Sequence, residues 1–145
     1  MIKTFNIYNH PKLYNDQYWW KKDDIEFYKK IISPESSALE LGCGTGRLAL
    51  PLIRSNVDYY GLDISPKLCE YAQEIISPVD SKTRIHQGDI RNFNLEMKFD
   101  AIFIAFNSFL HIIDENDALK IFKAIKYHLS DDGQFILDIL MPNPD

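Results

Sequence analysis

The stretch ALELGCGTGR, residues 38–47, places Gly42, Gly44 and Gly46 at every second position directly after an apolar run. Glycine permits a positive φ and lets a ligand approach the backbone closely. The apolar run, 37–41, predicts a short strand, and residues 46–55 predict a helix that Pro51 should bend. A helix that begins beside glycines offers free N–H groups and a positive dipole end to an anionic group. The stretch therefore predicts a ligand-cradling turn, although packing of a tight turn would also explain the glycines.

Strands and helices are predicted to alternate along the rest of the chain. Further apolar strands are predicted over 57–65, 83–89, 99–106 and 134–141. Helices are predicted over 23–32, from the Ser65-Pro66 start to Pro78, and from the Asp114 cap to the Asp131-Asp132-Gly133 end, the last with an apolar stripe of Leu119, Phe122, Ile125 and Leu129. Strands joined by helical crossovers form a parallel sheet with helices on both faces.

Two aspartates follow the next two predicted strands. Asp63 lies 21 positions after Gly42 at the end of the second strand, and Asp89 follows the third. Ligands of open parallel sheets bind beyond the carboxyl ends of the strands. Asp63 can accept hydrogen bonds from both hydroxyls of a ribose. Asp89 can accept from an exocyclic amine, beside the Ile90 N–H, so the set predicts an adenosine-containing ligand. Taken singly, Asp63 could be a helix-start acid and Asp89 a loop acid.

The glycine spacing separates two classes of nucleotide-type cofactor. A dinucleotide site has the pattern G-x-G-x-x-G, in which the third glycine permits close packing of helix and strand. Here the spacing is G-x-G-x-G, and Arg47 stands where the dinucleotide pattern has glycine. An acid, Glu40, precedes the first glycine by two positions. The pattern disfavours a nucleotide-binding dehydrogenase, which remains a third hypothesis.

Five segments, in order, resemble those of the class I S-adenosylmethionine-dependent methyltransferases. LELGCGTGRLALPL is similar to their first motif, GLDISPKLCEYA to the segment with the ribose-binding acid, and QGDIRNF to the adenine-contacting segment. FDAIFIAFNSFLHI and HLSDDGQFILDI are similar to their fourth and fifth strands. The similarity covers about residues 23–141, and the ordered set is more specific than any single motif. The implied fold is α/β, a Rossmann-like three-layer sandwich with a mainly parallel sheet of about five strands.

The resemblance implies S-adenosylmethionine as cofactor, with S-adenosylhomocysteine as its product, and a role for each matching residue. Gly42, Gly44 and Gly46 would line the methionine part of the cofactor. Glu40 would steady the glycine loop or reach the methionine ammonium through water. Around the adenosine, Asp63 would bind the ribose, Ile64 would pack on the adenine, and Asp89 and Ile90 would recognise its edge. Ala105 or Phe106 would offer a carbonyl or a wall at the end of the fourth strand.

No catalytic residue is assigned. Methyl transfer needs a general base only when the acceptor begins protonated. Asn107, Ser108 and His111 follow the fourth strand. Asn107 could orient an acceptor and His111 could take a proton, but the interpretation of His111 as a packed helix-end residue is favoured over this. The aromatic residues of the N-terminal arm could form a lid over the cofactor or dock the arm on the helices: Phe5, Tyr8, Tyr14, Tyr18, Trp19 and Trp20.

Length, composition and charge bound the remaining possibilities. A chain of 145 residues with 26% charged residues suits one soluble domain, with an aromatic arm over 1–22 and a core over 23–145. The net charge of −5 argues against a nucleic-acid partner. No apolar run is long enough for a membrane span, and no metal-ligand spacing is present. Cys43 and Cys69 predict reduced thiols in a cytoplasmic protein, with a disulfide as the alternative.

The chain stops directly after the fifth strand, whereas the resembled family has seven strands. The expectation is therefore an intact cofactor side and an incomplete acceptor side. The apolar fifth strand would be an edge open to pairing with another chain or a second copy. The leading hypothesis is a methyltransferase acting on a small molecule. The alternative is a truncated cofactor-binding module without independent activity, or a fragment that needs a partner chain.

Overall fold

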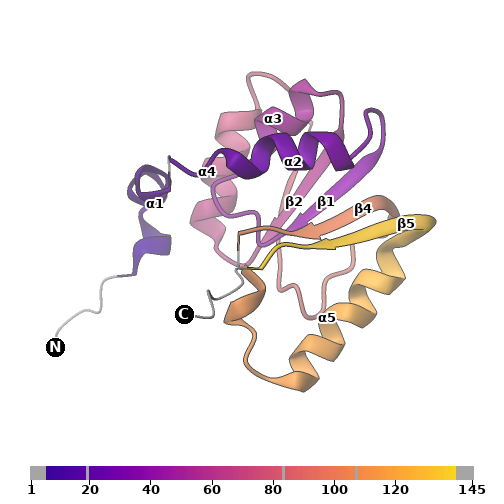
Figure 1. Cartoon of the computed structure of the whole chain (residues 1–145). Helices are drawn as coiled ribbons and strands as arrows, with labels where there is room; N and C mark the ends of the chain where they lie inside the picture. Colours follow the sequence, from indigo (N-terminus) through magenta and orange to yellow (C-terminus); the bar gives the residue numbers. More distant parts are fainter. Residues whose placement is uncertain (1–5, 19, 83, 107, 140–145) are drawn as a thin grey trace, which may run out of the picture.

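A single sheet of five parallel strands forms the centre of the molecule (Figure 1). The computed structural model describes residues 6–18, 20–82, 84–106 and 108–139. Within these ranges the strands are β1 (Ser37–Leu41), β2 (Asp58–Asp63), β3 (Ile85–Gln87), β4 (Phe99–Ile104) and β5 (Leu129–Leu137). Their order is β3-β2-β1-β4-β5, and every neighbouring pair is parallel. The strand order reverses between β1 and β4, which is where such sheets form a ligand crevice.

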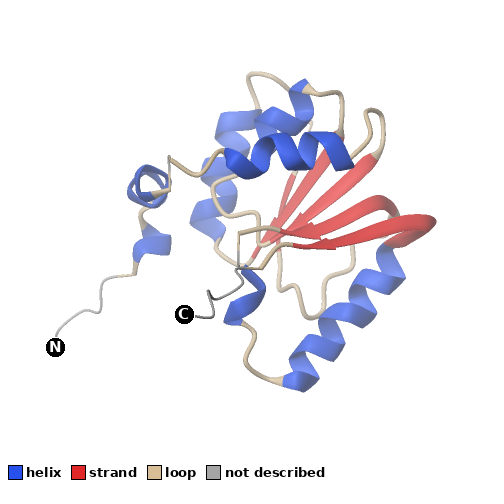
Figure 2. Ribbon diagram, in the orientation of Figure 1, coloured by secondary structure: helices blue, strands red, loops and turns tan. Residues whose placement is uncertain are grey.

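Helices cover both faces of the sheet, as predicted (Figure 2). One face carries α2 (Asp23–Ile31), α3 (Ala49–Arg54) and α4 (Pro66–Ile76), and the other carries α5 (Glu115–His128). The shorter helices are η1 (Ile7–Asn9) and α1 (Pro11–Gln17) in the arm, and η2 (Ser108–His111) after β4. The observed fold is thus the predicted three-layer α/β arrangement.

Alternation along the strands divides the core into two clusters. Ala38, Tyr59 and Phe103 pack toward α2, α3 and α4, whereas Leu39 and Ile102 pack toward α5. Side chains with a period of two point to opposite faces, so a central strand of a covered sheet must be apolar on both. In β4 every residue but Asp100 is buried, which confirms the predicted interior strand, although it ends at Ile104 and not at residue 106.

Both predicted helix starts are confirmed by their capping hydrogen bonds. The Ser65 hydroxyl accepts from Leu68 N, with Pro66 as the first residue of α4. The Asp114 carboxylate accepts from Asn116 N and Asp117 N at the start of α5. These side chains satisfy N–H groups that have no partner inside the helix.

The start of α3 and the end of α5 differ from the predictions. The helix expected over 46–55 begins only at Ala49, because residues 42–48 form successive turns. Gly133 does not close α5, which ends at His128 and passes directly into β5. Leu129 already pairs with Phe99, and the register then shifts before the next pairs. Pairing with β4 therefore overrides the helix-ending signal of residues 131–133.

The apolar stripe predicted for α5 is wrong in part. The buried residues of the helix are Ile121, Ile125 and His128, spaced four and three apart. Leu119 is 56% exposed and Phe122 is 40% exposed. Phe122 still contacts Phe109 and Phe135, at ring-centroid distances of 5.6 and 6.0 Å. The stripe is rotated because the sheet meets the helix along the 121–125–128 row.

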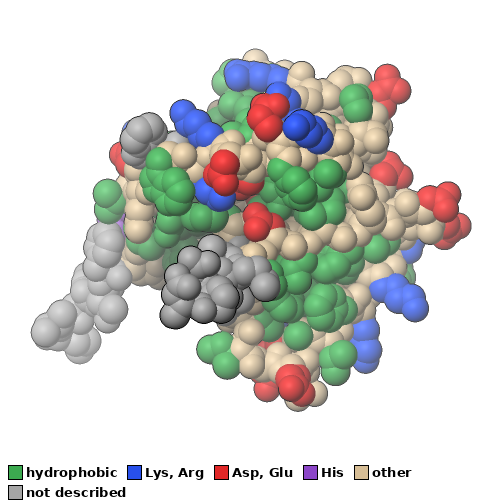
Figure 3. Space-filling model, in the orientation of Figure 1, with side chains coloured by type: hydrophobic (Ala, Val, Ile, Leu, Met, Phe, Trp, Pro, Cys, Tyr) green, Lys and Arg blue, Asp and Glu red, His purple; other side chains and the backbone are tan. Residues whose placement is uncertain are grey.

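The outer edge of β5 has no strand partner among the described residues. Hydrophobic side chains gather on the face in view, over α2 and around β5 and α5 (Figure 3). Pairing of this edge with a second copy or another chain stays a prediction, which light scattering at high protein concentration would test. No helix in the described ranges has both the length and the apolar character to cross a bilayer.

Candidate cofactor site

The glycine loop after β1 turns back over the end of β2. Gly42 N and Cys43 N both donate to Leu62 O, at 2.7 and 3.1 Å. Gly42, Gly44 and Gly46 have φ values of +76°, +55° and +72°, a region that side chains disfavour. The backbone conformation of this turn therefore explains why glycine is needed there, as predicted.

A hollow opens beside this loop at the carboxyl ends of β1 and β4. Half of the ten predicted cofactor residues line it: Glu40, Gly42, Gly44, Ala105 and Phe106. The remaining lining residues come from the arm, from the loop itself and from η2: Tyr14, Asn15, Tyr18, Cys43, Thr45, Arg47 and Ser108. The structure thus joins the first motif, the end of the fourth strand and the N-terminal arm around one space.

Glu40 is the acid of this hollow. It is 5% exposed, and its Oε2 accepts a 2.6 Å hydrogen bond from the Tyr59 hydroxyl. Burial raises the pKa of Glu40 to about 8, against the opposing effect of the Tyr59 hydrogen bond and of the Arg47 charge. A buried carboxylate of this kind gains most from a cationic partner.

Asp63 does not line the hollow but holds the glycine loop. Its Oδ2 accepts from Gly44 N at 2.8 Å, and its Oδ1 accepts from Ser65 N at 2.9 Å. Burial raises its pKa, although these backbone donors favour the ionised form. Each carboxylate oxygen has a lone pair left beyond these bonds, so Asp63 can steady the loop and accept from ligand hydroxyls together.

The other predicted residues are distributed outside the hollow. An added Cβ at Gly46 would lie 3.1 Å from the Ala72 Cβ, so Gly46 permits close packing of the loop on α4. Ile64, by contrast, is 64% exposed at the end of β2. Ile90 is half-buried and packs against the cluster on the α5 side of the sheet. Ile64 and Ile90 thus lie beyond the ends of β2 and β3, outside the hollow.

Asp89 is already paired. Its carboxylate accepts from Arg91 N, from Arg91 Nε and from Arg91 Nη2, while Arg91 Nη1 donates to Asp117 at 2.8 Å. The Arg91 hydrogen bonds hold the pKa of Asp89 below its ordinary value. The side chain therefore lies ionised and oriented at the surface, on the same edge of the sheet as Asp63.

The end of β4 forms an aromatic wall. Phe106 has a φ of +52°, an unusual conformation for a bulky residue, and its N–H donates to Asp138 Oδ2 at 3.4 Å. The rings of Tyr18 and Trp20 lie 5.1 and 6.5 Å from the Phe106 ring, both edge-on. The Arg47 guanidinium lies 5.6 Å from the same ring. Phe106 thus joins the hollow to the arm.

The N-terminal arm packs directly on the glycine loop. The Tyr14 ring lies 3.6 Å from the position that a Gly44 Cβ would take, and Thr45 Oγ1 donates to Asn15 Oδ1 at 3.3 Å. Burial raises the pKa of Tyr14 to about 12. Tyr14 and Tyr18 line the hollow, so the arm docks and also covers the site. Phe5 and Trp19, named with them from the sequence, lie outside the described residues.

Arg47 fastens the arm to the loop. Its Nη1 and Nη2 donate to the two carboxylate oxygens of Asp24 at 2.7 and 2.6 Å, and Nη1 also donates to Lys21 O. Asp24 is 6% exposed. A bidentate pair of this geometry fixes the relative position of α2 and the loop.

Of the three residues considered for the acceptor side, one lines the hollow. Ser108 lies against the loop, with its Cβ 3.3 Å from the position of a Gly42 Cβ. His111 is exposed at the end of η2 and does not line the hollow, and Asn107 lies outside the described residues. The described residues contain no group of side chains that could hold a metal ion. Cys43 and Cys69 are both free and buried.

The contacts of Tyr59 and Arg47 at this site are not predicted by the sequence. In the sequence, Arg47 indicates only a departure from the dinucleotide pattern. Tyr59 shares a strand face with Asp63, by the period of two, and this signal could have placed it near the site. Its pairing with Glu40 depends on the register of β1 and β2, in which Ala38 lies opposite Tyr59 and Glu40 opposite Gly61.

The fold and site define a class of protein: a doubly wound parallel sheet with a hollow at the switch point between β1 and β4, where such sheets bind their ligands. Residues 38–133 match the family model described as a methyltransferase domain. The chain therefore belongs to the S-adenosylmethionine-dependent methyltransferase domain family, as the sequence resemblance predicted.

Individual relatives agree with this membership. The chain is 31% identical over 113 residues to an uncharacterized methyltransferase of Anoxybacillus flavithermus, covering 76% of this chain and 49% of that protein. It is 27% identical over 116 residues to a dTDP-3-amino-3,4,6-trideoxy-alpha-D-glucopyranose N,N-dimethyltransferase of Streptomyces venezuelae, covering 79% and 47%. The chain thus spans about half the length of these curated relatives.

A solved structure shows the same fold. An S-adenosylmethionine-dependent methyltransferase from Clostridium acetobutylicum superposes with a TM-score of 0.75 and 30% identity. The superposition covers 92% of this chain and 58% of the other. The sheet is therefore that of the methyltransferase fold, which confirms the predicted α/β architecture.

Proposed function

We propose that this chain binds S-adenosylmethionine along the carboxyl ends of β1, β2 and β3, with its amino-acid part at the hollow beside the glycine loop, and serves a methyltransferase with a small-molecule acceptor. The observation that carries the proposal is the pair of acids, Glu40 and Asp63, on the two sides of the loop. Glu40 suits a ligand ammonium, and Asp63 suits ribose hydroxyls. Family membership supports this assignment, because the fitting residues lie on the matching motifs.

The residues around the hollow fit the physical demands of methyl transfer. When bound, the cofactor supplies an activated methyl group on a sulfonium, so the protein contributes mainly positioning and exclusion of water. Tyr14, Tyr18 and Phe106 supply aromatic walls, which also favour a cation. We propose that Ser108 lies on the acceptor side, because it contacts the loop from η2. No described residue needs to act as a base.

Calorimetric titration tests the proposal. S-adenosylhomocysteine and S-adenosylmethionine should bind in a one-to-one ratio, and NAD should not. Binding of NAD alone would overturn the assignment in favour of a dehydrogenase. Transfer of labelled methyl groups to a panel of small amines and alcohols would then identify the acceptor. Amines come first, because one relative is named as an N,N-dimethyltransferase of an amino sugar nucleotide.

A second candidate is a cofactor-binding module without activity of its own. The observation that favours testing it is the match to only about half the length of the relatives. Tight binding of S-adenosylhomocysteine with no turnover on any acceptor would support this candidate, and turnover would exclude it.

A further inference from the structure

One buried hydrogen bond lies directly behind the hollow, on the side of the core. Tyr59 on β2 donates its hydroxyl to Glu40 Oε2 on β1 at 2.6 Å. Tyr59 is fully buried and Glu40 is 5% exposed. Among the described residues this is the single hydrogen bond to the Glu40 carboxylate. A hydrogen bond to a buried carboxylate is strong and directional.

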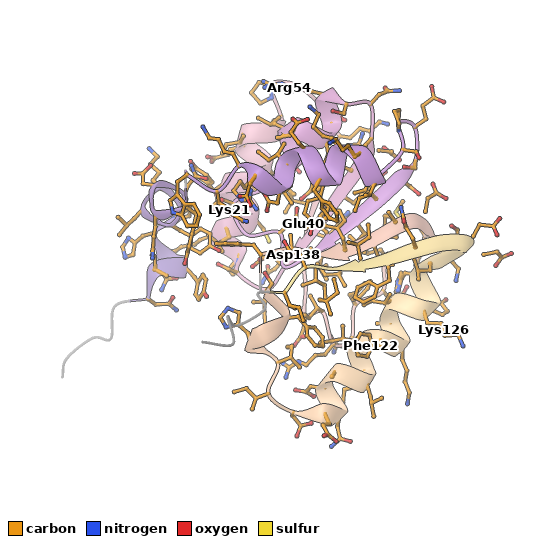
Figure 4. The ribbon with its side chains drawn as sticks, viewed as in Figure 1. Lys21, Glu40, Arg54, Phe122, Lys126 and Asp138 are labelled. Carbon is orange, nitrogen blue, oxygen red and sulfur yellow. The ribbon has the colours of Figure 1, made fainter. Side chains whose placement is uncertain are left out.

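The position of the pair relates it to the ligand. Glu40 lines the hollow and Tyr59 does not, so Tyr59 holds the carboxylate from the side of the core. Figure 4 shows Glu40 near the centre of the molecule, between α2 and the strands. One oxygen is thus engaged from within, and the other has no partner among the described residues. A ligand ammonium is the group that would complete the carboxylate.

We propose that Tyr59 is the positioning residue of Glu40, orienting the carboxylate so that it binds the ammonium of the amino-acid part of the ligand. This inference rests on the proposed function, since it takes the amino-acid tail to lie beside Glu40. Tyr59 itself touches no ligand. It acts through Glu40 alone, so its contribution should vanish for a ligand that lacks the ammonium.

The proposal includes a change in proton occupancy. Burial raises the pKa of Glu40 to about 8, so binding of a proton to Glu40 competes with binding of a ligand ammonium near neutral pH. The titratable groups that face Glu40 come from each packed element. They are Tyr59 and Asp63 on β2, Asp24 and Tyr28 on α2, Cys43 and Arg47 in the loop, and Tyr14 on α1. An ammonium binds the ionised carboxylate, so its arrival should release the proton. Affinity for such a ligand should therefore rise from pH 6 to pH 8.

Three ligands separate the ammonium from the rest of the cofactor. S-adenosylhomocysteine has both the ammonium and the carboxylate, decarboxylated S-adenosylhomocysteine has only the ammonium, and methylthioadenosine has neither. Calorimetry at pH 8 should show that Tyr59→Phe binds the first two about 10-fold more weakly than the wild type, the effect of one lost hydrogen bond to a charged group. Methylthioadenosine should bind both proteins equally. Loss of the hydroxyl also removes a contribution that lowers the Glu40 pKa, so the pH profile of Tyr59→Phe should shift upward.

Tyr28→Phe is the matched control. The Tyr28 hydroxyl is also buried, and it has no hydrogen-bond partner in the described part of the chain. Tyr28 packs on Phe103 in the same cluster as Tyr59 but does not line the hollow. Its variant should bind all three ligands as the wild type does. Glu40→Gln should abolish the proton release that titration in two buffers of different ionisation enthalpy measures.

The outcomes distinguish the two proposals. If the wild type binds none of the three ligands, the proposed function fails. If it binds them and Tyr59→Phe weakens all three equally, or none, the positioning role is overturned while the proposed function stands. Selective weakening of the two ammonium ligands, with an upward shift of the pH profile, supports it.

Discussion

The two halves of the proposed ligand site differ in how they are enclosed. At β1 and β4 the hollow is walled by the glycine loop, the arm and Phe106, and its acid, Glu40, is buried. At β2 and β3 the surface is open, with Ile64 64% exposed and Asp89 paired to Arg91. The enclosed half is built into the core, whereas the open half is built from surface side chains.

The acids of the two halves show the consequence. The pKa of Glu40 is raised because burial disfavours its charge, and the pKa of Asp89 is lowered because Arg91 stabilises its charge. In the proposed site the enclosed half therefore presents an acid whose charged form a bound cation would stabilise, whereas the open half presents an acceptor that is already ionised near neutral pH. The same type of side chain thus differs in its charge because of its surroundings.

A substitution of Arg47, in the wall of the enclosed half, should have the largest effect, a loss of protein stability. Arg47→Ala removes both hydrogen bonds to the Asp24 carboxylate and leaves that acid buried without its charge partner. We expect the free energy of unfolding to fall by about 3 kcal/mol. Urea denaturation measures it. Arg54→Ala is the control, because Arg54 is exposed and lies far from Glu40 (Figure 4). Equal stability of the two variants would contradict the structural role.

Asp63 lies between the two halves, and its substitution should have the second largest effect, a loss of ligand affinity. Asp63→Ala removes acceptors for Gly44 N and Ser65 N and for the proposed ribose contact. S-adenosylhomocysteine should bind roughly 10- to 100-fold more weakly by calorimetry. Asp58→Ala, at the other end of β2, is the control for binding. Unchanged affinity in Asp63→Ala would remove the ribose assignment.

Glu40→Gln tests the raised pKa of the buried acid through the stability of the protein and not through ligand binding. The folded pKa of Glu40 is about 8, above its ordinary value of about 4.3 in an unfolded chain. The folded protein therefore binds a proton that the unfolded chain releases, and the contribution of Glu40 to stability falls as pH rises through this window. The glutamine variant does not titrate. Its melting temperature should exceed that of the wild type by a few degrees at pH 8 and by less at pH 5. A gap that is constant with pH would show that the Glu40 pKa is not raised.

The smallest effect is expected in the open half. Ile64→Ala removes an exposed side chain that would pack on one face of the adenine, so the affinity for methylthioadenosine should fall less than about five-fold. Val79→Ala, another exposed apolar residue, should have no effect on binding. A loss as large as that of Asp63→Ala would mean that the open half closes around the ligand.

Most of the fold could be predicted from local patterns. The five strands, the caps at Ser65 and Asp114 and the glycine turn depend on short-range signals: alternation, capping chemistry and positive φ. The errors fall where tertiary contacts override such signals. Leu119 and Phe122 continue a helical period but the sheet meets α5 on another row, and residues 131–133 resemble a helix end but lie inside β5.

The sequence by itself determined the alternation of strands and helices from residue 23 onward and the position of the glycine loop. It also indicated Glu40, Asp63 and Asp89 as acids near the ends of the first three strands, because each is recognised from residues close together in the chain. Only the tertiary structure decided that Tyr59 holds Glu40, that Arg47 ties the arm to the loop, and that Tyr14 covers Gly44. Those contacts join residues 19 to 30 positions apart. They depend on strand register and on how α1 and α2 dock, which no local pattern specifies.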